Sequence, residues 1–271
     1  MVNRVWQYHF GKGLVPTPND FGVRGTAPTH PELLDHLAAY FIKHKWSVKA
    51  MHRLIMSSRA YQMSAANDAR NAERDVNNDL LWRFNRRRLS AEEMRDAMLA
   101  ASGALDRTPG EAHPFPPENQ WHYTQHKQFF AVYDTTRRSV YLMQQRQRKH
   151  PLMEVFDGAD TNVSTSPRPL STTPLQALYL MNNPFVHSQA DQLAVRVGMA
   201  FDTLPRRLDY AFRLAYGRPP TPIEVREAIS YIGQARRELR ATQLPADQIN
   251  RAALASYLRV VLSSNEFLYL D

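Results

Sequence analysis

The sequence contains no cysteine among its 271 residues. This absence excludes disulfide bonds, thiolate metal sites, a cysteine nucleophile and covalent attachment of a c-type haem through a C-x-x-C-H motif. It leaves the compartment open, because a cysteine-free chain suits an oxidising or a reducing environment. Because the haem-attachment motif and thiolate ligands are missing, we expect no cofactor in this chain.

Long apolar runs are also missing. The longest run is a few residues, far below the roughly 20 that a bilayer-spanning helix needs. The first residues, MVNRVWQYHFGKG, contain no apolar segment of the kind found in signal peptides. The sequence thus predicts no membrane span and no signal peptide in this chain.

Glycine is scarce, with 10 residues, and the familiar catalytic motifs are absent. The sequence shows no glycine-rich phosphate loop, no G-x-S-x-G and no H-E-x-x-H. Nucleotide binding, serine hydrolysis of the elbow type and zinc proteolysis are therefore not indicated. Hydrophobic residues make up 43% and charged residues 22%, which is ordinary for a globular chain with a real core.

Positive charge exceeds negative charge, with 34 basic and 26 acidic residues and a net charge of +8. The excess gathers in short clusters, which are typical of contact with an anionic polymer. The alternative is ion pairing with nearby acids such as Glu92, Glu93 and Asp96, which is the common fate of surface arginine. Nucleic acid is the less favoured polymer, because no base-reading motif is present. The candidate binding residues are Arg86, Arg87, Arg88, Arg138, Arg146 and Arg148.

Helix starts recur with one design. Four segments beginning at Thr29, Ser90, Thr173 and Thr221 read S/T-x-x-E/Q, the capping box in which the first hydroxyl and the third side chain satisfy each other's backbone N–H groups. Apolar residues at helical spacing follow each start. The sequence therefore predicts helices there, with Thr173 as an N-cap before any other role.

The predicted fold is mainly α-helical, a single domain over residues 1–271 with at most a minor β element. Residues 1–106 and 171–271 are predicted to be helical, and residues 107–170 irregular, because proline, histidine and aromatic residues gather there without a period. Within the irregular part, SVYLM at 139–143 is β-prone and predicts a short buried strand.

Two groups of residues have metal-ligand character. His122 and His126 are spaced i, i+4, but no third ligand is evident, so solvated histidines are the preferred interpretation. Asp157, Asp160 and Asn162 offer three oxygen ligands to a hard cation such as Ca²⁺, although Asx turns explain the same residues. The two aspartates also have the character of a glycosidase carboxylate pair, if a cleft holds them.

Motifs follow one another along nearly the whole chain. They include VNRVWQYHFGKGLVPTPNDFG, PTHPELLDHLAAYF, RRLSAEEMRDAMLAASGALD, EVFDGADTNVS, RPLSTTPLQALYLMNNPFV and NEFLYLD. This ordered series resembles the planctomycete-type domain of unknown function 1553. The resemblance implies a C-terminal domain of an exported protein that begins with a c-type cytochrome domain, hence a periplasmic or other extracytoplasmic location and the preceding domains as partners. It implies no reaction, substrate or catalytic residue.

The chain departs from the family pattern at three positions. Tyr8 stands where the family often has histidine, His36 where it has tryptophan, and Ala159 where proline is frequent. A role that needs histidine at position 8 is therefore not expected here. The family's polar motif positions fall on Asn19, Asp20, His30, Arg138, Asp157, Asp160, Arg168 and Thr173.

Three functions remain open from the sequence. The first is a non-catalytic interaction or scaffold domain, since no chemistry is recognisable. The second is an enzyme acting on a polysaccharide or other polymer, and the third is electrostatic binding of nucleic acid. A single pocket that gathers the polar candidates would favour the enzyme, and their dispersal at helix ends would favour the scaffold. Those catalytic candidates are Asp20, His30, Asp157, Asp160 and Arg168.

Overall fold

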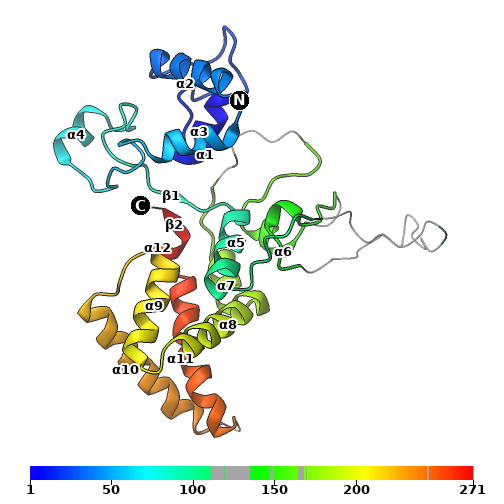
Figure 1. The fold of residues 1–271 in the computed structure, drawn as a ribbon, viewed down its shortest axis with the longest axis vertical. Coiled ribbons are helices and arrows are strands. Elements are labelled where there is room, and N and C mark those ends of the chain that lie inside the picture. The colour runs from blue at the N-terminus through cyan, green and yellow to red at the C-terminus, as the bar shows by residue number, and fades with distance from the viewer. Residues whose placement is uncertain are drawn as a thin grey trace. The chain divides into compact units, whose positions relative to one another are not determined.

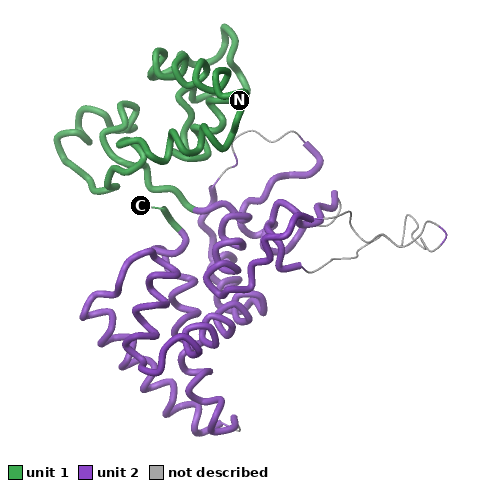
Figure 2. The backbone as a smooth tube through the Cα atoms, in the orientation of Figure 1, with its two compact units in different colours: residues 1–88, 269–271 green, residues 89–268 purple. Residues whose placement is uncertain are grey.

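The computed structural model of the chain describes residues 1–110, 119, 135–146, 149–163, 168, 170–242 and 244–270. These residues form two compact units (Figures 1 and 2). Unit 1 comprises residues 1–88 and 269–271, and unit 2 comprises residues 89–268. The single domain expected from the sequence stays a prediction.

Among its described residues, unit 1 contains four helices, three of which pack around a cluster of aromatic and aliphatic side chains. Its helices are α1 (Val2–Phe10), α2 (Pro31–Lys43), α3 (Val48–Met56) and the short α4 (Ala69–Arg74). The first three pack on one another, because each turns an apolar face inward. Trp6 and Phe10 stack with ring centroids 4.2 Å apart in the centre of this cluster.

The segment after α1 is fastened back onto that helix by a buried amide. Asn3, 2% exposed, donates from Nδ2 to the Val15 carbonyl at 3.0 Å and accepts from the Val15 N–H at 2.8 Å. Gly13 lies in the loop so formed, where a Cβ atom would come within 2.7 Å of Asn3 Nδ2. The close approach therefore requires glycine at this position.

Within the described residues, the β structure is a two-stranded antiparallel sheet that brings the end of the chain to unit 1. Strand β1 (Arg87–Arg88) pairs with β2 (Tyr269–Leu270), with Arg87 opposite Leu270 and Arg88 opposite Tyr269. Leu270 packs against the core cluster of unit 1.

Unit 2 is a helical assembly in which α8 packs against α5, α7, α9 and α11 (Figure 1). The residues that α8 (Pro184–Ala200) turns inward, such as Leu193 and Val197, are fully buried. The other elements are α5 (Ala91–Ser102), the 3-10 helix η2 (Ser139–Tyr141), α6 (Pro151–Val155), α7 (Pro174–Asn182), α9 (Leu204–Tyr216), α10 (Pro222–Leu239), α11 (Ala246–Leu262) and α12 (Asn265–Leu268).

Three of the four predicted capping boxes are confirmed. Ser90, Thr173 and Thr221 each cap a helix reciprocally with the residue three positions on. The box predicted at Thr29 is wrong. Helix α2 begins one residue later, with His30 as N-cap, and the Thr29 N–H bonds instead to the Leu14 carbonyl at 2.9 Å.

The mainly α-helical class with a minor β element is confirmed by the helices and the two short strands. The strand predicted at 139–143 is wrong, because residues 139–141 form η2. Asp96 explains the difference: its Oδ1 accepts from both the N–H (2.8 Å) and the Oγ (2.7 Å) of Ser139, which fixes the start of a tight turn. No helix among the described residues combines the length and the apolar character that a membrane crossing requires.

Replacing Thr173 should destabilise unit 2 through loss of a cap. The Gln176 N–H donates to Thr173 Oγ1 at 3.4 Å, and the Thr173 N–H donates to Gln176 Oε1 at 3.2 Å. Thr173→Ala should cost about 0.5–2 kcal/mol of unfolding free energy, measured by thermal melts. Thr173→Ser and Thr172→Ala are the matched controls and should be nearly silent. An unchanged melt for Thr173→Ala would contradict the structural role.

Candidate functional site

Two side chains of helix α5 hold the irregular segment of residues 135–139 in place. Arg95, 3% exposed, donates from Nη1 to the Arg137 carbonyl at 2.9 Å and to Ser139 Oγ at 3.3 Å, and from Nη2 to the Thr135 carbonyl. Its neighbour Asp96 holds Ser139 from the other side. One turn of α5 therefore fixes residues 135–139 through their backbone polar groups and the Ser139 hydroxyl.

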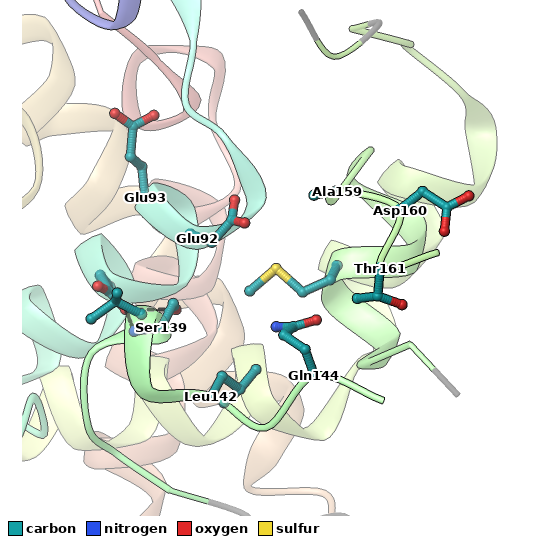
Figure 3. Close-up of a pocket in the computed structure, with 11 residues that line it drawn as sticks. Glu92, Glu93, Ser139, Leu142, Gln144, Ala159, Asp160 and Thr161 are labelled. Atoms are coloured by element: carbon teal, nitrogen blue, oxygen red, sulfur yellow. Dashed lines mark hydrogen bonds between the residues drawn. The ribbon is translucent and has the colours of Figure 1, made fainter. Parts of the chain in front are cut away.

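A pocket of about 610 Å³ opens beside this contact in unit 2 (Figure 3). Figure 3 shows Glu92 and Glu93 on α5 at one side, Asp160 and Thr161 on a loop at the opposite side, and Leu142 and Gln144 at the bottom of the view. Its wall is partly apolar, through residues such as Val140 and Met153. The lining residues are Glu92, Glu93, Asp96, Ser139, Val140, Leu142, Gln144, Met153, Ala159, Asp160 and Thr161.

The α5 carboxylates of this pocket are engaged in contacts that hold the fold. Arg168 Nη1 donates to Glu92 Oε2 at 2.7 Å, which joins position 168 to the first turn of α5. Glu93 accepts from the Ser90 N–H at 2.8 Å as half of the capping box. Asp96 accepts two hydrogen bonds from Ser139. Each carboxylate thus satisfies a donor of the structure itself.

Asp160 forms an Asx turn with Asn162. Its Oδ1 accepts from the Asn162 N–H at 2.9 Å and from Asn162 Nδ2 at 3.2 Å. The backbone hydrogen bond from Asn162 lowers the pKa of Asp160, so this carboxyl is ionised at neutral pH. A glycosidase acid needs a raised pKa, so the lowered pKa does not favour Asp160 as the acid of a carboxylate pair with Asp157. Of these two aspartates, Asp160 alone is among the described residues that line the pocket.

Asp157 ties the loop after α6 to the start of α7. Its Oδ2 accepts from the Ser171 N–H at 2.9 Å and its Oδ1 from Ser171 Oγ at 2.8 Å. Gln176 extends the connection by donating to Ser171 Oγ at 3.1 Å and to the Val155 carbonyl at 2.9 Å. Asp157 also has a left-handed backbone, with φ of 60°, a conformation that aspartate tolerates better than most residues.

The remaining two catalytic candidates belong to unit 1. Asp20 is exposed and accepts from the Gly22 N–H at 3.3 Å within a turn. His30 occupies the N-cap position of α2, without a capping hydrogen bond from its side chain. Its Nδ1 lies 3.0 Å from Thr29 Oγ1. The described structure therefore divides the five candidates between two units, and of the five the pocket contains Asp160 alone.

The arginine candidates differ in exposure. Arg86, Arg138 and Arg146 are exposed, Arg87 is half-buried, and Arg88 is 6% exposed in strand β1. Arg148 lies outside the described residues. A polymer-binding role stays a prediction, and the exposed arginines are the ones whose charge is available to solvent.

The metal candidates are distributed as follows. Asp157 and Asp160 accept from different partners, Ser171 and Asn162, so the Ca²⁺ site stays a prediction. His122 and His126 lie outside the described residues. Across the part of the chain that the structure describes, no three His, Asp or Glu side chains gather as a metal site.

Sequence reasoning did not identify Glu92, Asp96 and Ser139 as site residues. They come from two segments more than 40 residues apart, so no local motif joins them. The one available signal is the capping box of residues 90–93, which places Glu92 in the first turn of α5.

Comparison with known proteins gives a family but no activity. Residues 1–232 match the family model described as a protein of unknown function, DUF1553. This chain belongs to the DUF1553 family. The match covers all of unit 1 up to β1 and runs through unit 2 into α10. The pocket residues and the separate Asp157–Ser171 connection therefore lie within the DUF1553 region. No curated protein and no solved structure matches the chain.

The Asp157–Ser171 connection should contribute measurably to stability. Asp157→Ala leaves the Ser171 donors without their acceptor and places alanine in a left-handed conformation, so it should cost about 1–3 kcal/mol. Asp157→Asn, which tolerates the same backbone, should cost less. Thermal and denaturant unfolding measure both, and Asp160→Ala, which removes an exposed turn contact, is the control with the smaller change. Equal melts for Asp157→Ala and Asp160→Ala would contradict this assignment.

Proposed function

We propose that this chain is a non-catalytic interaction domain. The observation that carries the proposal is that its polar motif residues form hydrogen bonds and ion pairs within the fold. Asp157, Asp160 and Arg168 all engage partners within unit 2. Arg168 contacts Glu92 on α5, Asp157 holds Ser171 just before α7, and Asp160 closes a turn with Asn162. A domain of this kind presents loops of fixed shape on a helical scaffold, which is where binding surfaces are commonly found.

The proposed partner surface is cationic. Arg138 and Arg146 are exposed in unit 2, on a segment that Arg95 and Asp96 fasten to α5. The net charge of +8 attracts polyanions over a longer range than any single contact. An anionic polymer of the cell envelope or an acidic face of a neighbouring domain fits this chemistry.

The proposal places the domain outside the cytoplasm and next to a c-type cytochrome domain. Its support is the resemblance of the chain to the C-terminal part of exported proteins that begin with such a domain. In that setting the haem belongs to the preceding domain, and this domain contributes docking.

Binding to a polyanion should be electrostatic and independent of sequence. Replacing Arg138 and Arg146 together by alanine should lower the slope of log Kd against log salt by about 1.8, because each phosphate of duplex DNA that the protein neutralises contributes about 0.9 to that slope. The measurement is a salt titration of Kd with two duplexes of unrelated sequence and with heparin.

The matched control removes the same charge elsewhere in unit 2. Arg226 and Arg251 are exposed on α10 and α11, and their double alanine variant should keep the wild-type slope. Tight binding that persists at high salt, or an equal effect of both double variants, would contradict a cationic surface at Arg138 and Arg146.

A second candidate function is supported by the pocket of unit 2. A volume of about 610 Å³ admits one or two sugar rings, and Glu92 lies beside it on a rigid helix. If the domain is an enzyme acting on a polysaccharide, a substrate array should reveal hydrolysis by the purified chain. Glu92→Gln should then abolish the hydrolysis without changing the melting temperature by more than a few degrees, whereas an inactive wild-type chain leaves the interaction domain as the function.

A further inference from the structure

Unit 1 contains a pair of histidines that face one another from two helices. His9 Nε2, in the last turn of α1, lies 2.7 Å from His52 Nδ1, in the middle of α3. Both side chains are half-buried, so each ring is anchored in the unit and still reachable by solvent. The two helices are 37 residues apart in sequence and pack directly on one another.

The orientation of these rings is set by their surroundings. The His9 and His52 rings are inclined at 72°, with centroids 5.0 Å apart. Tyr61 meets the His9 ring edge-on at 5.4 Å, and Tyr61 in turn packs against Phe10 and Phe84 in the core cluster. The position of the His9 nitrogen is therefore supported by the aromatic core of unit 1.

The two nitrogens form a hydrogen bond in which one imidazole donates and the other accepts, and the tautomers decide which ring does which. The 2.7 Å contact therefore needs a single proton between the rings. When both rings carry their proton on the other nitrogen, two lone pairs are directed at the same small volume. A cation that accepts two imidazole ligands can take the place of the proton.

We propose that His9 and His52 bind a borderline divalent transition metal ion such as Zn²⁺ or Cu²⁺. Zinc–imidazole bonds of about 2.0–2.1 Å at a tetrahedral angle separate the two nitrogens by about 3.3 Å. The observed separation is 2.7 Å, so binding requires an opening of about 0.6 Å between α1 and α3, within reach of side-chain rotation. Water completes the coordination, since the rings are open to solvent.

Imidazole favours this class of ion over others. Hard cations such as Ca²⁺ and Mg²⁺ prefer carboxylate and carbonyl oxygens, whereas nitrogen ligands favour Zn²⁺ and Cu²⁺. The proposal concerns unit 1 and is independent of the interaction function proposed for unit 2. Failure of one does not decide the other.

The test is a titration of the untagged full chain with ZnCl₂ and with CuSO₄. Calorimetry should give one site, and the Cu²⁺ spectrum in electron paramagnetic resonance should show hyperfine splitting from two nitrogens. His52→Ala and His9→Ala should each weaken binding at least about tenfold, because a single imidazole remains. Saturating Zn²⁺ should raise the melting temperature of the wild type and leave that of both variants unchanged.

Three variants serve as controls. His36→Ala and His44→Ala remove exposed histidines of the same unit and should bind as the wild type does. His52→Gln preserves a hydrogen bond to His9 and guards against loss of folding, which circular dichroism checks. The assignment is overturned if His52→Ala and His52→Gln bind as tightly as the wild type, if the wild type does not bind either ion at millimolar concentration, or if binding is lost only in a His122→Ala, His126→Ala variant.

Discussion

The buried guanidinium of Arg95 is the contact on which the architecture of unit 2 depends. A charge that is 3% exposed is expensive unless its donors are satisfied, and here the acceptors are the carbonyls of Thr135 and Arg137 and the hydroxyl of Ser139. Those carbonyls belong to a segment without regular helix or sheet, so they need partners as much as the arginine does. The guanidinium donors and the carbonyl acceptors therefore satisfy one another, which removes the free-energy cost of burying either group without a partner. Ser139 then forms part of the pocket wall.

The parts of the fold that local chemistry controls could be predicted from the sequence. A capping box involves residues three positions apart, and the boxes at Ser90, Thr173 and Thr221 formed as expected. Thr29 has the same pattern and did not cap, because both its N–H and its hydroxyl donate to a distant carbonyl, that of Leu14. SVYLM at 139–143 failed for a similar reason, since Asp96 imposes a turn on a β-prone segment. Both errors come from a long-range contact that overrides a local preference.

The candidate site was harder to predict than the fold, for a physical reason. A loop that contains aspartate, serine and arginine has the same composition whether these side chains form hydrogen bonds to the backbone or act on a ligand. Asp157 and Asp160 have catalytic character in the sequence, yet one fastens Ser171 and the other closes a turn with Asn162. Arg168 and Glu92 meet across 76 residues, which no motif spacing describes. The residue types therefore predicted which loops contain the candidate polar residues, but not which groups their side chains contact.

The partners of a polar side chain separate the two cases better than its type does. The contacts of unit 2 described above join a donor to an acceptor, a carboxylate to an N–H or a guanidinium to a carbonyl, and such pairs are complete as they stand. His9 and His52 also form a donor–acceptor pair, but either ring can be the donor, because each imidazole has two interchangeable tautomers. The same two nitrogens can therefore direct two lone pairs at one point, which the carboxylate and guanidinium contacts of unit 2 cannot do. A metal ion can take the place of the shared proton there, and this property distinguishes the histidine pair from those contacts.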